Sequence, residues 1–155
     1  MKELPEINFR HRLPVQIRFN DIDMFGHLNN SVYIQFLDLG KYAYFRQFMS
    51  DTFGSEPTAP VVANINCDFI EPTKIDERLE VLTAITDIAD SSMTLDQRVV
   101  STTGRVKCSA RTIMVNIDLA TGRPTTVSDT WRRRIAAYQN NEKEGLCKKF
   151  LSFRM

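Results

Sequence analysis

Hydrophobic residues recur along the chain with two different spacings, which divide it into predicted strands and helices. From Pro14 to Phe19 apolar and polar residues alternate, which predicts a strand with one buried face. From Asn30 to about Phe48 the apolar residues recur every three or four positions, which predicts a helix of about five turns with a wide apolar face. The polar segment between these two elements contains Gly26 and is predicted to be a loop.

The chain after Pro60 is dominated by alternation with a period of two. This pattern predicts four strands, at 61–69, 79–88, 93–101 and 105–117. Pro72 breaks the chain after the first of them, because proline cannot donate a hydrogen bond inside a sheet. The last three strands are predicted to form an antiparallel meander. Ser128 is placed to cap a second, shorter helix, whose apolar residues are Trp131, Ile135 and Tyr138.

One long apolar helix and five strands must share a single hydrophobic core. The economical arrangement wraps a curved, mostly antiparallel sheet around the helix, so the predicted class is α+β. Gly40 supports this arrangement, because a glycine inside a helix costs about 1 kcal/mol relative to alanine, and close approach of another backbone would explain it. We expect a single domain over residues 1–155, with a core from about 13 to 138 and an extension at each end.

Composition excludes several classes of function. The chain is 43% hydrophobic and 25% charged, and its net charge of +1 provides no general attraction for nucleic acid or anionic membranes. Residues 1–12 are polar and lack the apolar stretch of a signal peptide. The three cysteines, Cys67, Cys108 and Cys147, are widely spaced, so we interpret them as reduced thiols in a cytoplasmic protein. Cys67 and Cys108 are expected to be small buried hydrophobic residues.

Groups capable of chemistry are concentrated just before the long helix. Free backbone amides and the positive end of the helix dipole attract an oxyanion there. Packing of apolar side chains alone would not select such a sequence. The polar groups in this short stretch are Asp21, Asp23, His27, Asn29 and Asn30.

The stretch from Arg18 to Tyr33 reads Arg-Phe-x-Asp-x-Asp-x-x-Gly-His-Leu-Asn-Asn-x-x-Tyr. It resembles the signature of hotdog-fold acyl thioesterases and is similar to the 4-hydroxybenzoyl-CoA thioesterase group. Its Asp-x-x-x-His-x-Asn-Asn part also resembles the plant acyl-ACP thioesterases. Element order and the step Phe69-Ile70-Glu71-Pro72 extend a weaker resemblance over about 13–138.

The resemblance implies a hotdog fold, in which a five-stranded, mostly antiparallel sheet wraps around one long helix and a short C-terminal helix follows. It also implies a homodimer, possibly a homotetramer, with sites at the dimer interface. Asp23 takes the position of the general base or nucleophile that acts on the thioester. The alternative for Asp23 is a carboxylate that only caps a turn. Asp21 is expected to orient the loop or to pair with Arg18.

Two further residues of the loop have candidate catalytic roles. His27 lies four residues after Asp23, which matches the plant spacing, and could bind the thioester carbonyl or the attacking water. It could also simply order the loop. The plant pattern has asparagine two residues after the aspartate, where this chain has Phe25. In a bacterial branch of the family the histidine lies seven residues after the aspartate, and Asn30 at that position could be an amide donor or a helix cap.

Substrate binding is expected from the start of the helix and from one distant residue. Backbone amides around Asn29 and Ser31 would polarise the thioester carbonyl as an oxyanion hole. Tyr33 could line the acyl pocket or pack in the core. Glu71 is a candidate second carboxylate, because a glutamate near this position is catalytic in the plant family.

These residues predict hydrolysis of an acyl-CoA or acyl-ACP to a free acid and a thiol. No metal or redox cofactor is expected, since coenzyme A or the acyl carrier enters as part of the substrate. His11 and His27 do not form a typical zinc site with the scattered cysteines. One alternative is a hotdog hydratase or dehydratase, which usually pairs its histidine with an acid on the long helix; here that helix has Asp38 and no histidine. A second alternative is a non-catalytic module that binds acyl thioesters.

Overall fold

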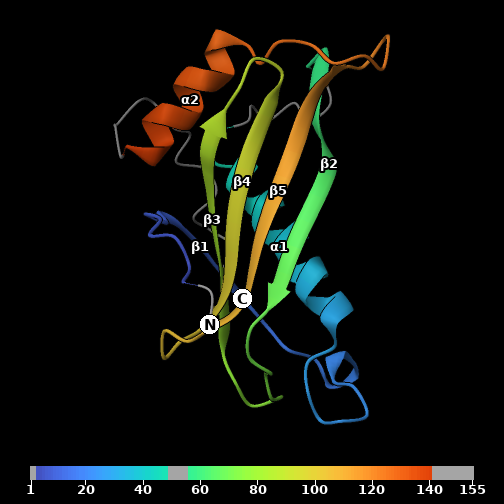
Figure 1. Cartoon of the computed structure of the whole chain (residues 1–155), viewed down its shortest axis with the longest axis vertical. Coiled ribbons are helices and arrows are strands. Elements are labelled where there is room, and N and C mark those ends of the chain that lie inside the picture. Colours follow the sequence, from blue (N-terminus) through green and yellow to red (C-terminus); the bar gives the residue numbers. More distant parts are fainter. Residues whose placement is uncertain (1–2, 49–55, 141–155) are drawn as a thin grey trace.

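A computed structural model of the protein describes residues 3–48 and 56–140 and contains one five-stranded sheet with two α-helices. The strands follow the order β1-β3-β4-β5-β2, and every neighbouring pair is antiparallel. Helix α1 runs along one face of the sheet, behind it in Figure 1. The element bounds are β1 (His11–Val15), α1 (Asn30–Phe45), β2 (Thr58–Phe69), β3 (Leu79–Ile88), β4 (Ser92–Ser101), β5 (Val106–Asp118) and α2 (Asp129–Gln139). This is the predicted α+β class and the predicted hotdog arrangement.

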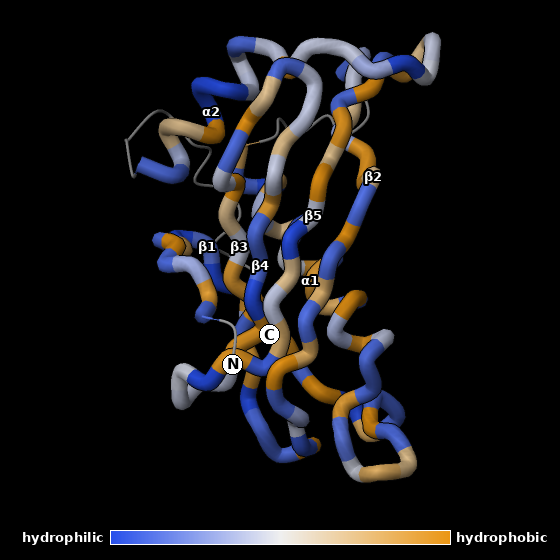
Figure 2. Tube along the Cα trace, in the orientation of Figure 1, coloured by the Kyte–Doolittle hydropathy of each residue, from blue (hydrophilic) through white to orange (hydrophobic). Residues whose placement is uncertain are grey.

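The predicted meander is present, because β3, β4 and β5 are consecutive neighbours in the sheet. Leu79 pairs with Ser101 at one end of β3, and Ser92 pairs with Val115 at the start of β4. β2 then returns to the far edge, beside β5. The alternation of hydrophobic and hydrophilic residues along these strands can be followed in Figure 2. The strand bounds after Pro60 agree with those predicted to within a few residues.

The first strand was predicted at Pro14 to Phe19 but spans His11–Val15. The chain leaves the sheet because Asp21 closes a short 3₁₀ turn at Phe19–Asp21. The Asp21 carboxylate accepts a hydrogen bond from the Arg18 amide at 2.7 Å, and the Arg18 carbonyl accepts one from the Asp21 amide at 3.0 Å. The alternating pattern beyond Val15 therefore belongs to a turn, although Ile17 still packs against the core.

Helix α1 begins at the predicted residue and ends three residues early. Asn29 is its N-cap, with its side-chain oxygen accepting a hydrogen bond from the Ser31 amide. A β-carbon added at Gly40 would lie 2.4 Å from Val81 Cγ1 and 3.2 Å from Gln97 Nε2. The sheet does approach the helix at Gly40, as predicted, but the atoms that require glycine belong to side chains rather than to another backbone.

The core has two parts, one at each half of α1. The part at the C-terminal half is closed by α2, which starts from the predicted cap, Ser128. The part at the N-terminal half lies under the candidate catalytic loop. Members of the first are Tyr44, Phe45, Phe48, Ile85, Met93, Leu95, Met114, Val127, Trp131, Ile135 and Tyr138; members of the second are Leu28, Val32, Tyr33, Phe36, Leu37, Leu79, Val81, Val99, Cys108 and Ala110.

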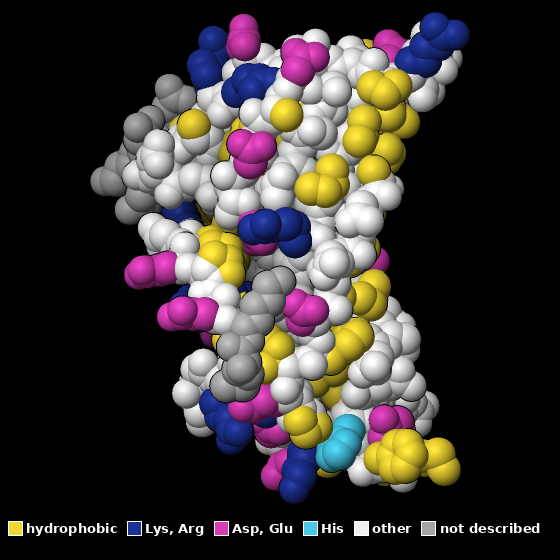
Figure 3. Space-filling view, viewed as in Figure 1, with side chains coloured by type: hydrophobic (Ala, Val, Ile, Leu, Met, Phe, Trp, Pro, Cys, Tyr) yellow, Lys and Arg dark blue, Asp and Glu magenta, His cyan; other side chains and the backbone are white. Residues whose placement is uncertain are grey.

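Strand β2 is an edge strand that the helix covers poorly, since α1 packs mainly on β1, β3 and β4. Val62 is 40% exposed, Ile65 38% and Phe69 45%. Figure 3 shows hydrophobic side chains at the surface along this edge and at the end of the molecule where the loop before α1 lies. Within the described ranges, none of the helices has the length and apolar character needed to cross a membrane.

Candidate active site

The loop before α1 is a compact turn held by its own backbone. Ile22 and Leu28 form an isolated antiparallel bridge, and the Asp23 amide donates to the His27 carbonyl at 2.8 Å. Gly26 completes the reversal with φ of +78°, a conformation that side chains disfavour. Asp23 and His27 are therefore held side by side at the two ends of the same turn.

The Asp23 carboxylate is half-buried and directed into this turn. Its Oδ1 accepts hydrogen bonds from the Phe25 amide at 2.9 Å and the His27 amide at 3.2 Å. This contact fixes the orientation of the carboxylate and is compatible with the turn-capping alternative. No described residue donates a hydrogen bond to Oδ2, so one carboxylate oxygen is available to a ligand or a water.

Asp21 takes the predicted supporting role. It is 2% exposed, and Arg18 Nη2 lies 2.8 Å from its Oδ1. The hydrogen bond from Arg18 lowers the pKa of the Asp21 carboxyl below its usual range, so this group is ionised and paired. The Asp21 carbonyl also accepts the Asn29 amide at 2.9 Å, which joins the turn to the helix cap.

The start of α1 combines a side-chain cap with exposed polar groups. Asn29 Oδ1 accepts both the Ser31 amide and the Ser31 hydroxyl at 3.0 Å. The Asn29 carbonyl accepts the Val32 amide at 2.9 Å. Asn29, Asn30 and Ser31 are all exposed, and the Asn30 amide in the first turn donates to no group of the described residues. Asn29 is thus the cap, which leaves the Asn30 side chain for another role.

Tyr33 packs in the core, which is one of the two roles predicted for it. It is 2% exposed, and its hydroxyl donates to Thr73 Oγ1 at 2.8 Å. Burial raises the pKa of this phenol, so the hydroxyl stays protonated. The ring contacts Phe69 at a centroid distance of 5.6 Å. A role in substrate binding stays a prediction.

The structure brings the segment of Glu71 beside the loop but directs its carboxylate elsewhere. Thr73 O accepts the Leu28 amide at 2.8 Å, so residues 71–73 line the base of the turn. Glu71 Oε2 lies 3.0 Å from Arg105 Nε and 3.5 Å from Lys107 Nζ. The hydrogen bond from Arg105 lowers the pKa of the Glu71 carboxyl. A carboxylate held between two cations is a weak base. Its ion pairs with Arg105 and Lys107 instead hold the segment 71–73 beside the loop.

Sequence reasoning missed Lys107, which links the elements behind the loop. Its side chain is 4% exposed, and Nζ lies 2.7 Å from Glu77 Oε2 and donates to the Pro72 carbonyl at 3.2 Å. The lysine thereby holds the segment that carries Thr73 against the turn. A lysine in the alternating pattern of β5 gives no local signal of this role, because its partners come from a distant part of the chain.

Two arginines of α2, Arg132 and Arg134, have structural partners. Arg132 donates to the carbonyls of Val127 and Asp90, at 3.0 and 3.1 Å. Arg134 donates to the Phe48 carbonyl at 3.4 Å. Arg132 thereby binds the turn between β3 and β4, and Arg134 binds the chain just after α1.

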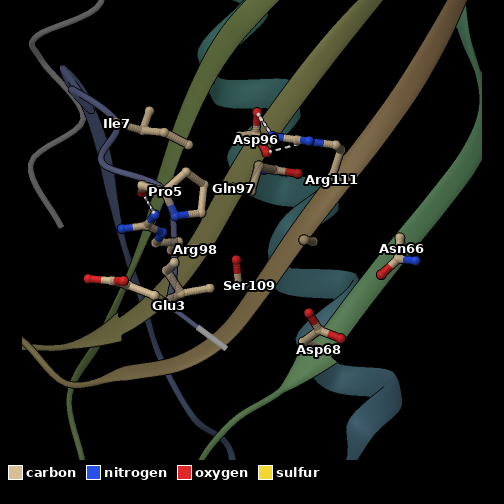
Figure 4. Close-up of a pocket in the computed structure, with 12 residues that line it drawn as sticks. Glu3, Pro5, Ile7, Asn66, Asp68, Asp96, Gln97, Arg98, Ser109 and Arg111 are labelled. Atoms are coloured by element: carbon tan, nitrogen blue, oxygen red, sulfur yellow. Dashed lines mark hydrogen bonds and ion pairs between the residues drawn. The ribbon is translucent and has the colours of Figure 1, made fainter. Parts of the chain in front are cut away.

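A hollow of about 300 Å³ lies on the other face of the sheet, between residues 3–7 and strands β4, β5 and β2. Asp96 and Arg111 form an ion pair across it at 2.9 Å, and Figure 4 shows both on the side of the sheet turned away from α1. It contains no predicted site residue. The candidate chemistry is therefore on the helix face of the molecule, and this hollow is separate from it. No cluster of metal-ligating side chains occurs within 3–48 and 56–140.

A sheet wrapped around one helix, with a carboxylate turn before the helix N-terminus, defines a hotdog protein with a thioesterase-type loop. Residues 17–135 match the family model of the thioesterase-like superfamily, and the chain belongs to that family. The expectation drawn from residues 18–33 is confirmed at this level, and the family is one of thioester hydrolases.

Relatives of known sequence agree with this membership. The chain is 26% identical over 109 residues to the acyl-CoA thioester hydrolase YbgC of Escherichia coli O6:H1, covering 69% of this chain and 81% of that protein. It is 26% identical over 117 residues to the uncharacterised protein YsmA of Bacillus subtilis, covering 74% and 78%.

Solved structures extend the similarity to the fold. A thioesterase from Thermus thermophilus, complexed with coenzyme A and Zn, superposes with a TM-score of 0.75 at 26% identity, covering 85% of this chain and 96% of that one. A Staphylococcus aureus protein in complex with CoA superposes with a TM-score of 0.75 at 14% identity and covers 98% of each chain, which shows the fold alone.

Proposed function

We propose that this protein hydrolyses an acyl thioester of coenzyme A or of an acyl carrier protein, with Asp23 as general base or nucleophile. The observation that carries the proposal is the orientation of the Asp23 carboxylate. Its Oδ1 is fixed by two amides of the turn that precedes α1. Similarity to a thioesterase complexed with coenzyme A and to YbgC supports the substrate class.

The chemistry divides between the turn and the helix. The free oxygen of Asp23 activates water or attacks the thioester carbon, which is more electrophilic than the carbon of an oxygen ester. The negative charge that develops on the carbonyl oxygen is stabilised by amides of the first turn of α1, with Asn30 as the central donor. His27 lies at the other end of the turn from Asp23. Its imidazole hydrogen-bonds the thioester carbonyl or the attacking water. Neither step uses a metal or redox cofactor.

The hydratase alternative fits the helix poorly. A dehydration site requires a histidine and an acid placed together, and α1 has no histidine. Its one acid, Asp38, is exposed and lies 2.7 Å from Lys41 Nζ. The non-catalytic alternative would not require a carboxylate fixed in orientation with one oxygen free.

We propose a cytoplasmic homodimer in which a second copy completes the site. The uncovered β2 edge supports this assembly, since an exposed apolar edge strand is a surface that natural proteins usually protect. Phe25 on the loop is 77% exposed and Met24 is 91% exposed, so the loop itself offers apolar surface that one chain leaves unpaired.

Thiol release from a panel of acyl-CoAs, followed with a thiol reagent, tests the activity. The wild type should release free coenzyme A together with the free acid, whereas Asp23→Asn should bind substrate with little turnover. Binding without release of thiol by the wild type across the panel would favour the non-catalytic module. Accumulation of a hydrated acyl-CoA would favour the hydratase.

Light scattering tests the assembly. Ile65→Lys, on the β2 edge, should give a folded monomer with reduced hydrolysis. Leu119→Lys is the matched control, because Leu119 is 52% exposed and lies beyond the end of β5. A wild type that is monomeric and fully active would contradict completion of the site by a second copy.

A further inference from the structure

Two cysteine thiols touch across neighbouring strands. Cys67 Sγ and Cys108 Sγ are 3.1 Å apart. In the β2–β5 ladder Cys67 lies opposite Ala110 and Cys108 lies opposite Phe69, so the cysteines are diagonal neighbours on one face of the sheet. This is the inner face, because Cys108 belongs to the core beside Tyr33 and Cys67 packs against it. The thiols therefore need no change of strand or face to meet.

The two sulfur atoms differ in access and in ionisation. Cys67 is half-buried, whereas Cys108 is fully buried. The hydrogen bond with Cys108 lowers the pKa of the Cys67 thiol, while the same bond and burial raise the pKa of Cys108. The thiolate is the reactive form of cysteine. Cys67 is thus the accessible nucleophile, and Cys108 is the protonated neighbour.

We propose that Cys67 and Cys108 are an oxidative modification site, at which a hydroperoxide converts two thiols into an intramolecular disulfide. The Cys67 thiolate attacks one oxygen of hydrogen peroxide, the O–O bond breaks, and the leaving hydroxide takes a proton to become water. Cys67 is then a sulfenic acid. The Cys108 sulfur attacks it, the S–S bond forms, and the S–O bond breaks. The released hydroxide leaves as water with the Cys108 proton, so the thiols lose two electrons and the peroxide gains them.

The surrounding structure permits this closure. A disulfide has an S–S distance of about 2.05 Å, so the sulfur atoms must approach by about 1 Å from their present contact. Within the described residues β2 pairs with β5 alone, so an approach of β2 toward that partner breaks no other ladder of the same chain. A resolving thiol already in contact also stops the oxidation of Cys67 before sulfinic acid, which is irreversible in most proteins.

Peptide mapping of the full-length protein tests the proposal. Cys147 lies outside the described residues and would add a third thiol, so the test uses the Cys147→Ser variant. The protein is exposed to hydrogen peroxide, unfolded and alkylated. The peptides that contain Cys67 and Cys108 should then be linked, with a mass lower by two hydrogen atoms than the sum of the two reduced peptides. Neither cysteine should then react with the alkylating reagent, and reduction with dithiothreitol should make both reactive again.

Two single substitutions provide matched controls. In Cys67→Ser, Cys108 should stay alkylatable after the same exposure, because it is buried and protonated. In Cys108→Ser, Cys67 should pass to sulfenic and then sulfinic acid, because no thiol resolves it. Recovery of Cys67 as sulfinic acid while Cys108 remains a thiol in the parent variant would overturn the proposal, as would a disulfide between two copies. Because the readout is peptide mass, the outcome is independent of thioester hydrolysis.

Discussion

The two ends of α1 differ in what surrounds them. At the C-terminal end Tyr44 is fully buried, and aromatic rings approach it edge-on at centroid distances of 5.2 Å for Phe48 and 5.6 Å for Tyr138. At the N-terminal end, Asn29 and Asn30 are exposed and the loop is held by hydrogen bonds to its own backbone. We call these the closed end and the open end.

The difference separates stability from chemistry along one helix. The closed end buries large aromatic surfaces, which contribute most to the free energy of folding. The open end is fixed by short polar contacts, which orient groups while leaving them accessible. Substitutions at the closed end should therefore change stability with little effect on turnover, and those in the loop should do the opposite. The following predictions test this separation, from the largest expected effect to the smallest.

Trp131→Ala should lower the free energy of unfolding by about 3–5 kcal/mol, the scale for truncating a buried aromatic residue. Trp131 packs at the closed end, with its ring 5.8 Å from Phe45 and 5.9 Å from Phe48. Denaturant unfolding gives the stability, and kcat per folded molecule should change little. Arg133→Ala on the exposed side of α2 is the control. A large loss of kcat in fully folded Trp131→Ala would remove the distinction between the two ends.

Asp23→Asn should reduce kcat by a factor on the order of 10² or more, the scale of a general base, with little change in KM. Asparagine retains an oxygen that accepts the Phe25 and His27 amides, so the turn should persist and stability should change little. Steady-state thiol release measures both constants.

Neighbouring substitutions rank the loop residues. Asp21→Asn should reduce kcat much less than Asp23→Asn, because Asp21 is committed to Arg18. His27→Ala should fall between them, since water and backbone donors replace part of an orienting imidazole. An inactive Asp21→Asn beside an active Asp23→Asn would place the catalytic carboxylate two residues earlier.

Gly40→Ala tests the boundary between the ends. The added β-carbon would overlap Val81 Cγ1, and overpacking costs about 1–3 kcal/mol, which opposes the gain of about 1 kcal/mol in helix propensity. A net loss of stability is expected by chemical denaturation. The double variant with Val81→Ala should recover part of that loss, because the nearest clashing atom is removed. Strict additivity of the two substitutions would show that the contact does not limit the packing of α1 on β3.

Asn29→Ala and Ser128→Ala remove equivalent caps from the two helices. Each side-chain oxygen accepts one backbone amide, from Ser31 at 3.0 Å and from Trp131 at 3.3 Å. Each variant should lose about 1 kcal/mol of stability. Only Asn29→Ala should also lower kcat, because its cap orients the amides of the open end. Equal kcat values in the two variants would contradict the role of those amides.

His11 predicts a small pH dependence at the closed end. Its ring is 6% exposed and lies against Tyr44, and burial lowers the pKa of the imidazole from its ordinary value near 6.5. As the pH falls, the unfolded chain therefore takes up the proton before the folded chain does. The free energy of unfolding should be constant above the ordinary pKa of the imidazole and should fall between that pKa and the lower pKa of the folded state. His11→Phe keeps a ring at this position and should abolish this slope in denaturation curves measured from about pH 7.5 to about pH 5.

Local patterns in the sequence determined much of this protein. The period of the apolar residues located α1 and four of the strands, because that period depends on backbone geometry alone. Residues at fixed short spacings determined the cap at Ser128 and the pairing of Arg18 with Asp21, whereas the structure selected Asn29 rather than Asn30 as the cap of α1. The same stretch, residues 18–33, carried enough information to indicate the family.

The tertiary structure decided what depends on contacts between distant residues. Alternation in β2 predicted one buried face, but the strand is at the edge of the sheet and α1 packs mainly on other strands, so residues of that face such as Ile65 and Phe69 are exposed. The contact of Cys67 with Cys108 and the bridge from Lys107 to Glu77 join residues far apart in the chain. Periodicity reports which residues share a face, whereas burial and charge pairing depend on which element lies across that face.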